Sequence, residues 1–383
     1  MTLYINGRFL TQPMSGVQRY AHGLVQAFDN LLMRRSDLRD LFGPVVMLGP
    51  FYSGHDRADY PKYQAIEVSP LGAARGHVWE QSTLYRASRD GVLLSLGNSG
   101  PLAHPAQVIA FHDAHVFEMP DSFAKQYRRW HQFLRPRLAH RAAGLVTVSR
   151  FSAQSLGKWL GVDPGRFHIV PNAAEHFLTV PENHEAVAKY ELQRGAYFLS
   201  VGNQSPNKNL GTLAAAHAAA GPGVPELVIV GDAPRALCSV THEQQSHVRY
   251  LGRVSDSDLH GLFRGSAGFV FPSLHEGFGI PPLEAMQLGV PVLSSATSAM
   301  PEILGDAPMW FDPRDQAGLT EQLRWFAGME PSERKRRIDL GLAQAARYSW
   351  QSSAEVLADC LRDVFVQDGM FEQTPLKARV SGR

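Results

Sequence analysis

Two glutamates, Glu276 and Glu284, flank a short turn rich in glycine and proline in the sequence HEGFGIPPLE. An apolar run that is typical of a strand, GFVFPS, precedes this turn, and Pro281 and Pro282 stand at the start of a helix-like segment. Proline suits the first turn of a helix, because the N–H group that it lacks would have no partner there. Glu276 should therefore leave the end of a strand, and Glu284 should lie one turn inside the next helix. Two carboxylates so placed can accept hydrogen bonds from hydroxyl groups on different parts of one ligand.

The turn between the glutamates also supplies main-chain N–H groups at the positive end of the helix dipole. These groups belong to Gly277, Phe278, Gly279 and Ile280. Anions bind readily at such helix starts. A nucleoside-diphosphate sugar has this pattern, with a negative centre and hydroxyl groups at both ends. Either glutamate alone can equally be a loop residue or a first-turn carboxylate favoured by the dipole, so the interpretation depends on the rest of the chain.

Three other segments place suitable groups at the ends of apolar runs. Lys208, in SVGNQSPNKNL, can set an ammonium group against a phosphate. His112 and Asp113 follow the run QVIAF, and Gly16, in SGVQRY, precedes a helix-like segment. Each also has a plainer interpretation as a solvated lysine, a strand end or a flexible turn. A metal site at His112, Asp113 and His115 is disfavoured, because this group lacks a third ligand at a suitable spacing.

Two series of apolar, β-branched runs alternate with helix-like segments and must position these residues. The first series comprises residues 2–6, 44–49, 91–97, 107–113 and 144–149. The second begins near residue 195 and continues at 226–231, 247–252, 268–273, 290–295 and 309–313. Runs that are apolar throughout are typical of parallel strands buried on both faces. We therefore predict two doubly wound α/β domains that bind ligands beyond the carboxyl ends of their strands.

The length of the chain agrees with two domains, because 383 residues exceed what one hydrophobic core usually supports. We predict an N-terminal domain over residues 1–171 and a C-terminal domain over residues 172–350. A helix over residues 351–370 could cap either domain. The polar residues 371–383 should form a frayed tail.

Charge, cysteine content and hydropathy restrict the partners and the compartment. The formal net charge is +1, but basic residues predominate in the first 170 residues and acidic residues in the remainder, which suits phosphates or an anionic membrane face. The two cysteines form no CxxC pair, the start lacks a signal pattern, and no apolar run approaches ~18 residues, so we expect a cytoplasmic protein. No recognition motif accompanies the basic charge, which disfavours nucleic acid as a partner.

The ordered segments resemble the retaining glycosyltransferases of glycosyltransferase family 4, and among them the bacterial mannosyltransferases. The segments are SGVQRYA, VWEQSTL, FHDAHVFEMPDSF, LVTVSRFSAQSL, VPNAAEHF, SVGNQSPNKNL, LVIVGD, YLGRVSDSDL, FPSLHEGFGIPPLEAMQLGVPVL and SAMPEILGDAPMWFDP. They cover nearly the whole chain, and the spacing of Glu276 and Glu284 around GFG is the most specific of them. The resemblance implies the GT-B fold, in which two Rossmann-like domains face each other across a cleft. The N-terminal domain would bind the acceptor and the C-terminal domain the nucleotide sugar.

The resemblance also implies a role for individual residues. Glu276 would contact hydroxyl groups of the transferred sugar, and Glu284 would contact the ribose. Lys208 would bind the diphosphate, with Gly16 beside it. His112 would contact the donor sugar near the reacting carbon, so that Glu276, His112 and Lys208 form the expected catalytic set.

One departure from the family concerns the phosphate site. Many members have an arginine at the position of Asn203 or of Asn207, and here both are asparagine. Lys208, the amides of the turn and Arg253, in LGRVSD, must then offset the charge of the leaving group. We therefore place Asn203 and Arg253 among the expected donor-binding residues.

The acidic triplet DSD, residues 256–258, superficially matches the triplet with which the other glycosyltransferase fold holds manganese. Ser255 explains it without a metal, as a helix N-cap followed by acidic residues in the first turn. We expect neither a metal nor a cofactor, because Lys208 and a helix start can stabilise the departing diphosphate.

The donor and the acceptor follow from the middle of the N-terminal half. The portion from VWEQ to FHD looks most like mannosyltransferases that use GDP-sugars in surface-polysaccharide assembly, so GDP-mannose is the first choice of donor and a UDP-hexose the second. The acceptor would be a saccharide or a lipid-diphosphate-linked saccharide near His112 and Asp113. Residues 125–141 mix basic and aromatic side chains and could contact the inner face of an anionic membrane. They could equally form a core-packed helix with a solvated basic face, and Pro136 argues against one unbroken helix.

Two other classes of function share this pattern. A non-catalytic nucleotide-sugar binder would keep the fold, but the joint presence of Glu276, Glu284, Lys208 and His112 argues against it. A GT-B epimerase is a further alternative, and a phosphorylase would need a pyridoxal-phosphate lysine and usually a longer chain. The family implies retention of configuration, which we expect to occur by same-face displacement of the diphosphate by the acceptor hydroxyl.

Overall fold

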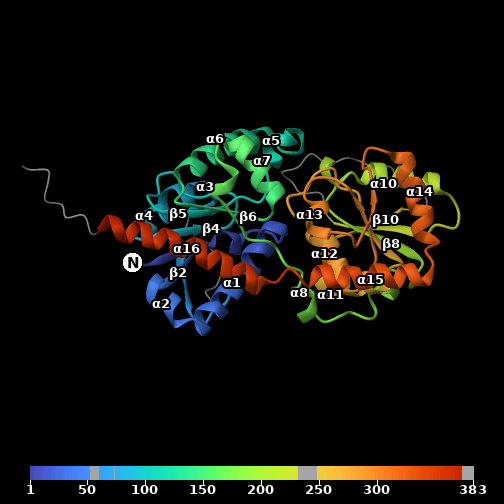
Figure 1. Ribbon diagram of the computed structural model, residues 1–383, viewed down its shortest axis with the longest axis horizontal. Helices are drawn as coiled ribbons and strands as arrows, with labels where there is room; N and C mark the ends of the chain where they lie inside the picture. Colours follow the sequence, from blue (N-terminus) through green and yellow to red (C-terminus); the bar gives the residue numbers. More distant parts are fainter. Residues whose placement is uncertain (52–59, 73, 232–247, 373–383) are drawn as a thin grey trace, which may run out of the picture.

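The computed structural model describes residues 1–51, 60–72, 74–231 and 248–372, and it contains two parallel sheets. The first sheet has seven strands in the order β3-β2-β1-β4-β5-β6-β7 and the second has six in the order β10-β9-β8-β11-β12-β13. Figure 1 shows the two sheets in separate lobes, each with helices packed around it. This architecture confirms the predicted pair of doubly wound domains.

The first sheet takes its strands from the first 169 residues. They are β1 (Leu3–Asn6), β2 (Val45–Pro50), β3 (Ile66–Leu71), β4 (Val92–Ser95), β5 (Gln107–Ala110), β6 (Gly144–Thr147) and β7 (Phe167–Ile169). The helices of this lobe are α1 (Gly16–Arg34), α2 (Ser36–Phe42), α3 (Gly76–Trp79), α4 (Tyr85–Ser88), α5 (His115–Glu118), α6 (Lys125–Arg141) and α7 (Arg150–Leu160). The short helices α8 (His176–Thr179) and α9 (Ala186–Lys189) follow β7. The predicted domain boundary at residue 172 lies in the segment between β7 and the first strand of the second sheet.

The second sheet follows the same plan. Its strands are β8 (Tyr197–Val201), β9 (Glu226–Val230), β10 (Val248–Gly252), β11 (Gly268–Phe271), β12 (Val292–Ser295) and β13 (Met309–Phe311). Its helices are α10 (Leu210–Ala220), α11 (Asp256–Gly265), α12 (Ile280–Gln287), α13 (Met300–Leu304), α14 (Gln316–Ala327) and α15 (Pro331–Ala345). None of the helices in the described part of the chain is long and apolar enough to cross a bilayer.

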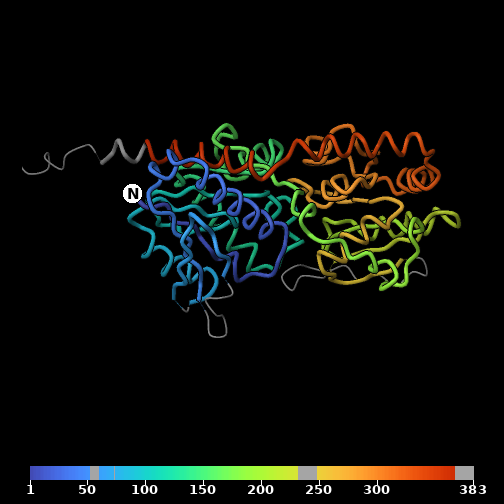
Figure 2. Tube along the Cα trace, turned by 90° about the horizontal axis from the view of Figure 1, so that it is seen from below, coloured from blue at the N-terminus to red at the C-terminus, as the bar shows by residue number. Residues whose placement is uncertain are grey.

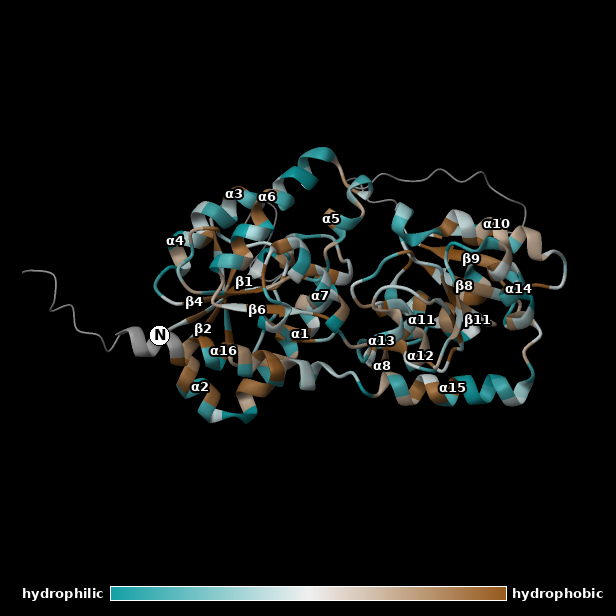
Figure 3. Cartoon of the chain, turned by 45° about the horizontal axis from the view of Figure 1, so that its top comes forward, coloured by the Kyte–Doolittle hydropathy of each residue, from teal (hydrophilic) through white to brown (hydrophobic). Residues whose placement is uncertain are grey.

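Burial explains why these runs form strands. Every residue of β4, β5, β6, β11 and β12 is buried, as expected for central strands that helices cover on both faces. Figure 3 shows the apolar residues concentrated in the strands and the polar residues on the outer helices. The carboxyl ends of the two sets of strands are therefore the positions at which polar side chains can meet a ligand.

The last described helix, α16 (Trp350–Glu372), returns to the first domain. Figures 1 and 2 show it along α1, and its Phe365 ring lies 5.1 Å from the Phe42 ring of α2. At its start, the Trp350 ring lies 6.0 Å from that of Tyr20 in α1. The chain thus crosses between the domains twice. The predicted frayed tail lies, from residue 373 onward, outside the described residues.

Candidate active site

The turn after β11 has the local structure that the sequence predicts. β11 ends at Phe271, and α12 begins at Ile280 with prolines in its first positions. Gly279 precedes the helix with a φ of 91°, which residues with a side chain rarely adopt. A Cβ atom there would also lie 2.5 Å from Cε of Met300. Glycine is therefore required at this position for the chain to enter α12.

A cavity of about 290 Å³ lies between the carboxyl ends of the two sheets. Its walls come from the segments that follow β1, β5, β6 and β7 in the first domain, and β8, β10 and β11 in the second. Most of the side chains and turn residues predicted from the sequence line it. They are Gly16, His112, Asp113, Lys208, Glu276, Gly277, Phe278, Gly279, Ile280 and Glu284. Residues up to 268 positions apart in the sequence thus meet in one cavity.

Two predicted donor-binding residues do not line this cavity. The Oδ1 atom of Asn203 accepts a hydrogen bond from the Ser205 N–H group at 3.1 Å, so its side chain stabilises its own loop. Arg253 donates to the carbonyl oxygen of Met14 at 3.0 Å. Met14 itself lines the cavity, so Arg253 acts on the wall from outside. The structure thus places these two side chains outside the cavity that the other predicted residues line, and their role in donor binding stays a prediction.

Lys208 and Glu276 form an ion pair inside the cavity. The Nζ and Oε1 atoms are 2.5 Å apart, and the two side chains are only 18% and 14% exposed. The Glu276 N–H group donates to Oγ of Ser298 at 3.0 Å, which fixes the main chain of the turn. Asn209 has a φ of 55° and donates to a carbonyl oxygen of the β11 loop, which fixes the chain beside Lys208. A diphosphate that binds Lys208 would release the Glu276 carboxylate for hydroxyl groups.

Glu284 is buried and has partners that the sequence analysis did not identify. Its Oε1 atom lies 2.9 Å from Nε2 of His176 and 4.0 Å from Nε of Arg19. Arg19 also forms a two-pronged pair with Asp256, at 2.9 and 3.2 Å. Burial opposes the charge of Arg19, but the bond from Asp256 and the charge of Glu284 outweigh it and raise its pKa. Arg19 lines the cavity, and its position three residues after Gly16 in a helix could have indicated this.

His112 is held in one orientation at the end of β5. Its Nε2 atom lies 2.9 Å from the carbonyl oxygen of Leu96, and its main-chain N–H group donates to Oδ1 of Asn98 at 2.8 Å. A carbonyl oxygen only accepts hydrogen bonds, so Nε2 must carry the proton and Nδ1 is unprotonated in the neutral ring. Burial lowers the pKa of His112 despite the bond to Leu96, which favours this neutral form. His112 can therefore accept a hydrogen bond from a ligand hydroxyl group.

Asp113, beside His112, keeps its negative charge in a partly buried position. Its Oδ1 atom accepts the His115 N–H group at 3.0 Å and lies 3.9 Å from Nη1 of Arg135. Burial alone would raise its pKa, but the charges of His115 and Arg135 outweigh burial and lower it. A charged carboxylate at the wall of the first domain can bind hydroxyl groups of an acceptor.

The two domains are in direct contact around the cavity. The carbonyl oxygen of Gly277 accepts hydrogen bonds from Oγ of Ser149 at 2.7 Å and from Oγ of Ser152 at 3.1 Å. The carboxylate of Glu302, in α13, accepts the first two N–H groups of α7 at 2.8 and 2.9 Å. A carboxylate is favoured there by the positive end of the helix dipole. These contacts hold the glycine turn against the first domain.

A second contact across the domains involves the residue before Glu276. The Nε2 atom of His275 lies 3.0 Å from Oε2 of Glu118, which belongs to α5 of the first domain. The other oxygen of Glu118 accepts hydrogen bonds from Oγ of Ser155 at 2.6 Å and from Nε1 of Trp159 at 3.2 Å. Because both of these donors belong to α7, they hold the Glu118 carboxylate in a fixed position, where it can pair with His275.

The ionisation of this pair favours the contact at mildly acidic pH. Burial disfavours the charged ring of His275, but the contact with Glu118 and its charge, with those of Asp113 and Glu276, raise its pKa above the ordinary value. Burial would raise the pKa of Glu118, but His275 and Ser155 lower it to about 2. Both partners are thus charged above the ordinary carboxylate pKa and below the raised pKa of His275.

We expect replacement of His275 by glutamine to remove a pH-dependent part of the stability. His275 binds its proton more tightly in the folded state than in the unfolded state. Its contribution to the free energy of unfolding is therefore complete below its unfolded pKa and is lost as the pH rises through its folded pKa. For this partly exposed pair we expect ~1 kcal/mol. Thermal unfolding of both proteins between pH 6 and pH 9 measures it. The contributions of the other histidines are the same in both proteins and cancel in the comparison. A difference in stability between the two proteins that does not change with pH would contradict the assignment.

The acidic triplet at the start of α11 has the structural role that the sequence predicts. The Ser255 side chain caps the helix by accepting the Asp258 N–H group at 3.1 Å. Asp258 binds Nζ of Lys189 at 2.6 Å and Nδ2 of Asn183 at 2.7 Å, while Asp256 pairs with Arg19. Within the described ranges, no group of three or more His, Cys, Asp or Glu side chains is placed to hold a metal ion.

Two sequence families match this chain. Residues 168–340 match the family described as Glycosyl transferases group 1, and residues 92–176 match Glycosyltransferase Family 4. The matches overlap over residues 168–176, at the end of the first sheet, and together include every lining residue discussed above except Met14, Gly16 and Arg19. They confirm the resemblance that the sequence motifs indicate.

Curated relatives and solved structures agree with this result. The chain is 29% identical over 266 residues to O-antigen chain mannosyltransferase B of Escherichia coli, which covers 64% of this chain and 67% of the relative. It is 28% identical over 262 residues to O-antigen chain mannosyltransferase RfbU of Salmonella typhimurium, with 65% and 70% covered. A match to the E. coli serotype-specific mannosyltransferase WbdA, at 28% identity over 56% of this chain, spans only 28% of that longer protein.

The overall fold also has close structural neighbours. Sucrose-phosphate synthase from Thermosynechococcus elongatus superposes with a TM-score of 0.70 at 15% identity and covers 96% of this chain and 100% of the other. WaaG, a glycosyltransferase involved in lipopolysaccharide biosynthesis, gives 0.65 at 18% identity, with 94% and 99% covered. These similarities confirm the predicted GT-B fold.

Proposed function

We propose that this chain, a glycosyltransferase by both of its family matches, is a retaining hexosyltransferase that moves mannose from GDP-mannose to a saccharide or lipid-linked saccharide. One observation carries the proposal: Lys208, Glu276 and Glu284 meet in one cavity with the N–H groups at the start of α12. Cationic and amide groups suit the diphosphate, and the flanking carboxylates suit hydroxyl groups of the sugar and the ribose. The relatives named as O-antigen mannosyltransferases support mannose and a place in surface-polysaccharide assembly.

The reaction would rely on positioning and on stabilisation of the leaving diphosphate. The bond from the anomeric carbon to the diphosphate oxygen breaks as the acceptor oxygen forms its bond on the same face. A diphosphate oxygen takes the proton of the acceptor hydroxyl. Lys208 and the amides of residues 277–280 would bind the negative charge that develops on the diphosphate. His112, with an unprotonated Nδ1, would hold a donor hydroxyl near the reacting carbon.

Each carboxylate in the cavity has a partner that suits it to binding. Glu276 pairs with Lys208, Glu284 with His176, and Asp113 with the His115 N–H group. Because these contacts hold the carboxylates as acceptors at the walls, we assign them to hydroxyl binding and propose no covalent sugar–enzyme intermediate. Arg19 adds a cation beside Glu284.

The test is the release of nucleotide from a panel of GDP-, UDP- and ADP-sugars, with and without acceptor. We expect GDP-mannose to be hydrolysed slowly without acceptor and consumed faster with a mannose-containing saccharide. Proton NMR of the product would then show the anomeric configuration of the donor retained. The Lys208→Ala protein is the control for contaminating hydrolases. If the protein prefers a UDP-hexose, that sugar nucleotide replaces GDP-mannose as the proposed donor. Binding of sugar nucleotides without turnover of any of them would favour the non-catalytic alternative.

The proposal also places the protein at the inner face of a membrane, through α6 and its surroundings. Pro136 does not interrupt α6, which continues from residue 125 to 141. Leu134, Leu138 and Arg135 point inward, and Nη1 of Arg135 donates to the carbonyl oxygen of Asp113 at 2.9 Å. Exposed aromatic side chains remain, with Phe133 46% exposed. An interface of aromatic and basic side chains suits an anionic bilayer that presents a lipid-linked acceptor.

We expect the double variant Lys125→Ala, Arg129→Ala to bind anionic vesicles about 30-fold more weakly. Both side chains are exposed on α6, and each basic residue near an anionic surface contributes ~1 kcal/mol. Flotation with phosphatidylglycerol vesicles measures the binding, and phosphatidylcholine vesicles are the control for charge. Equal flotation on both kinds of vesicle would favour the plain solvated face.

A further inference from the structure

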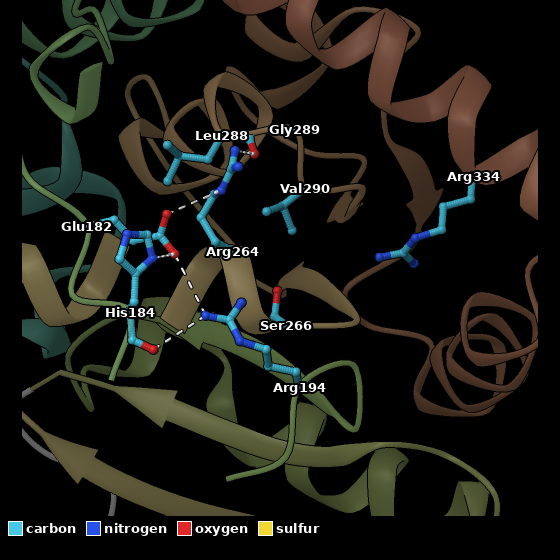
Figure 4. Close-up of a pocket in the computed structure, with 9 residues that line it drawn as sticks. All are labelled: Glu182, His184, Arg194, Arg264, Ser266, Leu288, Gly289, Val290 and Arg334. Carbon is cyan, nitrogen blue, oxygen red and sulfur yellow. Dashed lines mark hydrogen bonds and ion pairs between the residues drawn. The ribbon is translucent and has the colours of Figure 1, made fainter. Parts of the chain in front are cut away.

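A second cavity lies at the opposite edge of the second sheet from the candidate active site. It has a volume of about 490 Å³, and Ser266 and Val290, which line it, immediately precede the regions of β11 and β12. The active-site cavity lies beyond the carboxyl ends of the same strands. The two cavities are therefore separated by the sheet. We call this second cavity the arginine pocket, and Figure 4 shows its lining residues.

The arginine pocket collects cationic side chains from three separate parts of the chain. Arg194 precedes β8, Arg264 belongs to α11, and Arg334 belongs to α15. The carboxylate in the lining is that of Glu182, which lies 3.7 Å from Nε of Arg264, 3.8 Å from Nη2 of Arg194 and 3.1 Å from Nδ1 of His184. Figure 4 shows these groups together on one side of the pocket. The lining therefore holds three guanidinium groups and one carboxylate, and that carboxylate pairs with only two of them, Arg194 and Arg264.

Arg334 approaches the pocket from the other side. Its Nη1 atom donates to the carbonyl oxygen of Ala267 at 2.6 Å, and Figure 4 shows it apart from Glu182. Across the described ranges no carboxylate lies within 4.0 Å of its guanidinium group. Burial lowers the pKa of Arg334, and the main-chain oxygen of Ala267 is its hydrogen-bond partner in place of a carboxylate. On the same helix, by contrast, Arg336 and Arg337 both pair with Glu333.

We propose that the arginine pocket binds a small phosphate-bearing ligand between Arg334 and the pair formed by Arg194 and Arg264. Guanidinium groups match phosphate oxygens in geometry and charge, and their existing bonds to main-chain oxygens and Glu182 hold them partly in position. Leu288 and Val290 supply an apolar wall for the organic part of the ligand. The volume is within the range of small-molecule sites. The inference is independent of the donor and of the reaction proposed above.

Calorimetric titration of the full chain with glycerol phosphate tests the proposal. Phosphate could also enter the active-site cavity, so the Lys208→Ala protein is titrated in parallel. We expect binding to persist in Lys208→Ala and to weaken about tenfold or more in Arg334→Ala, because a charged hydrogen-bond partner is lost. Arg334→Lys should bind with intermediate strength. Arg336→Ala, on the same helix and already paired with Glu333, is the matched control and should bind as the parent does.

Two results would overturn the proposal. One is loss of all binding in Lys208→Ala, which would assign the phosphate to the active-site cavity. The other is equal binding by Arg334→Ala and Arg336→Ala, and circular dichroism would confirm that both remain folded. Phosphatidylglycerol vesicles distinguish the source of the phosphate. Arg334-dependent flotation without binding of free glycerol phosphate would identify a lipid headgroup as the ligand, still within the proposed site.

Discussion

Replacement of Glu276 by alanine should lower kcat about 100-fold. The Glu276 carboxylate lines the active-site cavity, and under the proposed function it would accept two hydrogen bonds from the donor sugar. A hydrogen bond to a charged group contributes ~1.5 kcal/mol, and the loss of two such bonds corresponds to about two orders of magnitude in rate. The fold should survive, because the main-chain bond from residue 276 to Ser298 does not need the side chain.

Steady-state kinetics with the preferred donor measure this effect, and a mutant cycle with Lys208 sharpens it. Glu276 and Lys208 are 2.5 Å apart, so their effects should not be additive. Lys208→Ala should mainly weaken diphosphate binding and departure, and the double variant should lose less than the product of the two single effects. Glu276→Gln keeps the size and shape of the side chain but removes its charge, so it shows how much of the effect depends on the charge. Turnover close to that of the parent in Glu276→Ala would remove this residue from the site.

Replacement of Gly277 by alanine should force the two domains apart and reduce kcat/KM about 100-fold. A Cβ atom at this position would lie 2.3 Å from the carbonyl oxygen of His112 and 3.1 Å from Oγ of Ser152. The first contact is with main chain, so no side-chain rotation relieves it. The hydrogen bonds from Ser149 and Ser152 to the Gly277 carbonyl oxygen would then lengthen or break. Misplacement of reacting groups by about 1 Å can cost this much in rate.

The expected signature of this variant is a catalytic loss with nearly normal donor binding. The proposed donor-binding residues Glu284 and Lys208 belong to the second domain, so nucleotide affinity measured by calorimetry should change little. Small-angle X-ray scattering should show a larger radius of gyration. Gly97→Ala is the matched control, because a Cβ atom there would have no heavy atom within 4 Å. Parent-like turnover in Gly277→Ala would show that the domain contact is not needed for reaction.

The sequence predicts best those features that depend on neighbouring residues. The central strands are apolar almost throughout, and this pattern predicts all six strands of the second sheet. The pattern misses β3 and β7, the two edge strands of the first sheet, because both are partly exposed and have polar residues among the apolar ones. Pro136 removes one hydrogen bond without ending α6, since a core-facing side holds the helix.

The candidate site was predictable to the same extent. The turn between Glu276 and Glu284 is local, so its residue types indicate its conformation. The pairing of Arg19 with Asp256 and of Glu118 with His275 joins residues 237 and 157 positions apart. Such contacts depend on how two separately folded domains meet, and one sequence carries no signal for that. The same reason explains why Arg253, which donates to Met14 of the first domain, lies outside the cavity. Asn203 lies outside it for a local reason, since its side chain accepts the N–H group of Ser205 in its own loop.

The return of α16 to the first domain restricts how the protein can open. The chain passes between the domains twice, and a hydrogen bond joins the two connecting segments. The carboxylate of Glu175, in the first segment, accepts the N–H group of Trp350, in the second, at 2.7 Å. Two chain connections at one edge act as a hinge. They allow the domains to rotate about a single axis and resist torsion or sliding. Substrate entry would therefore widen the far rim of the cleft while the Trp350 edge stays in place.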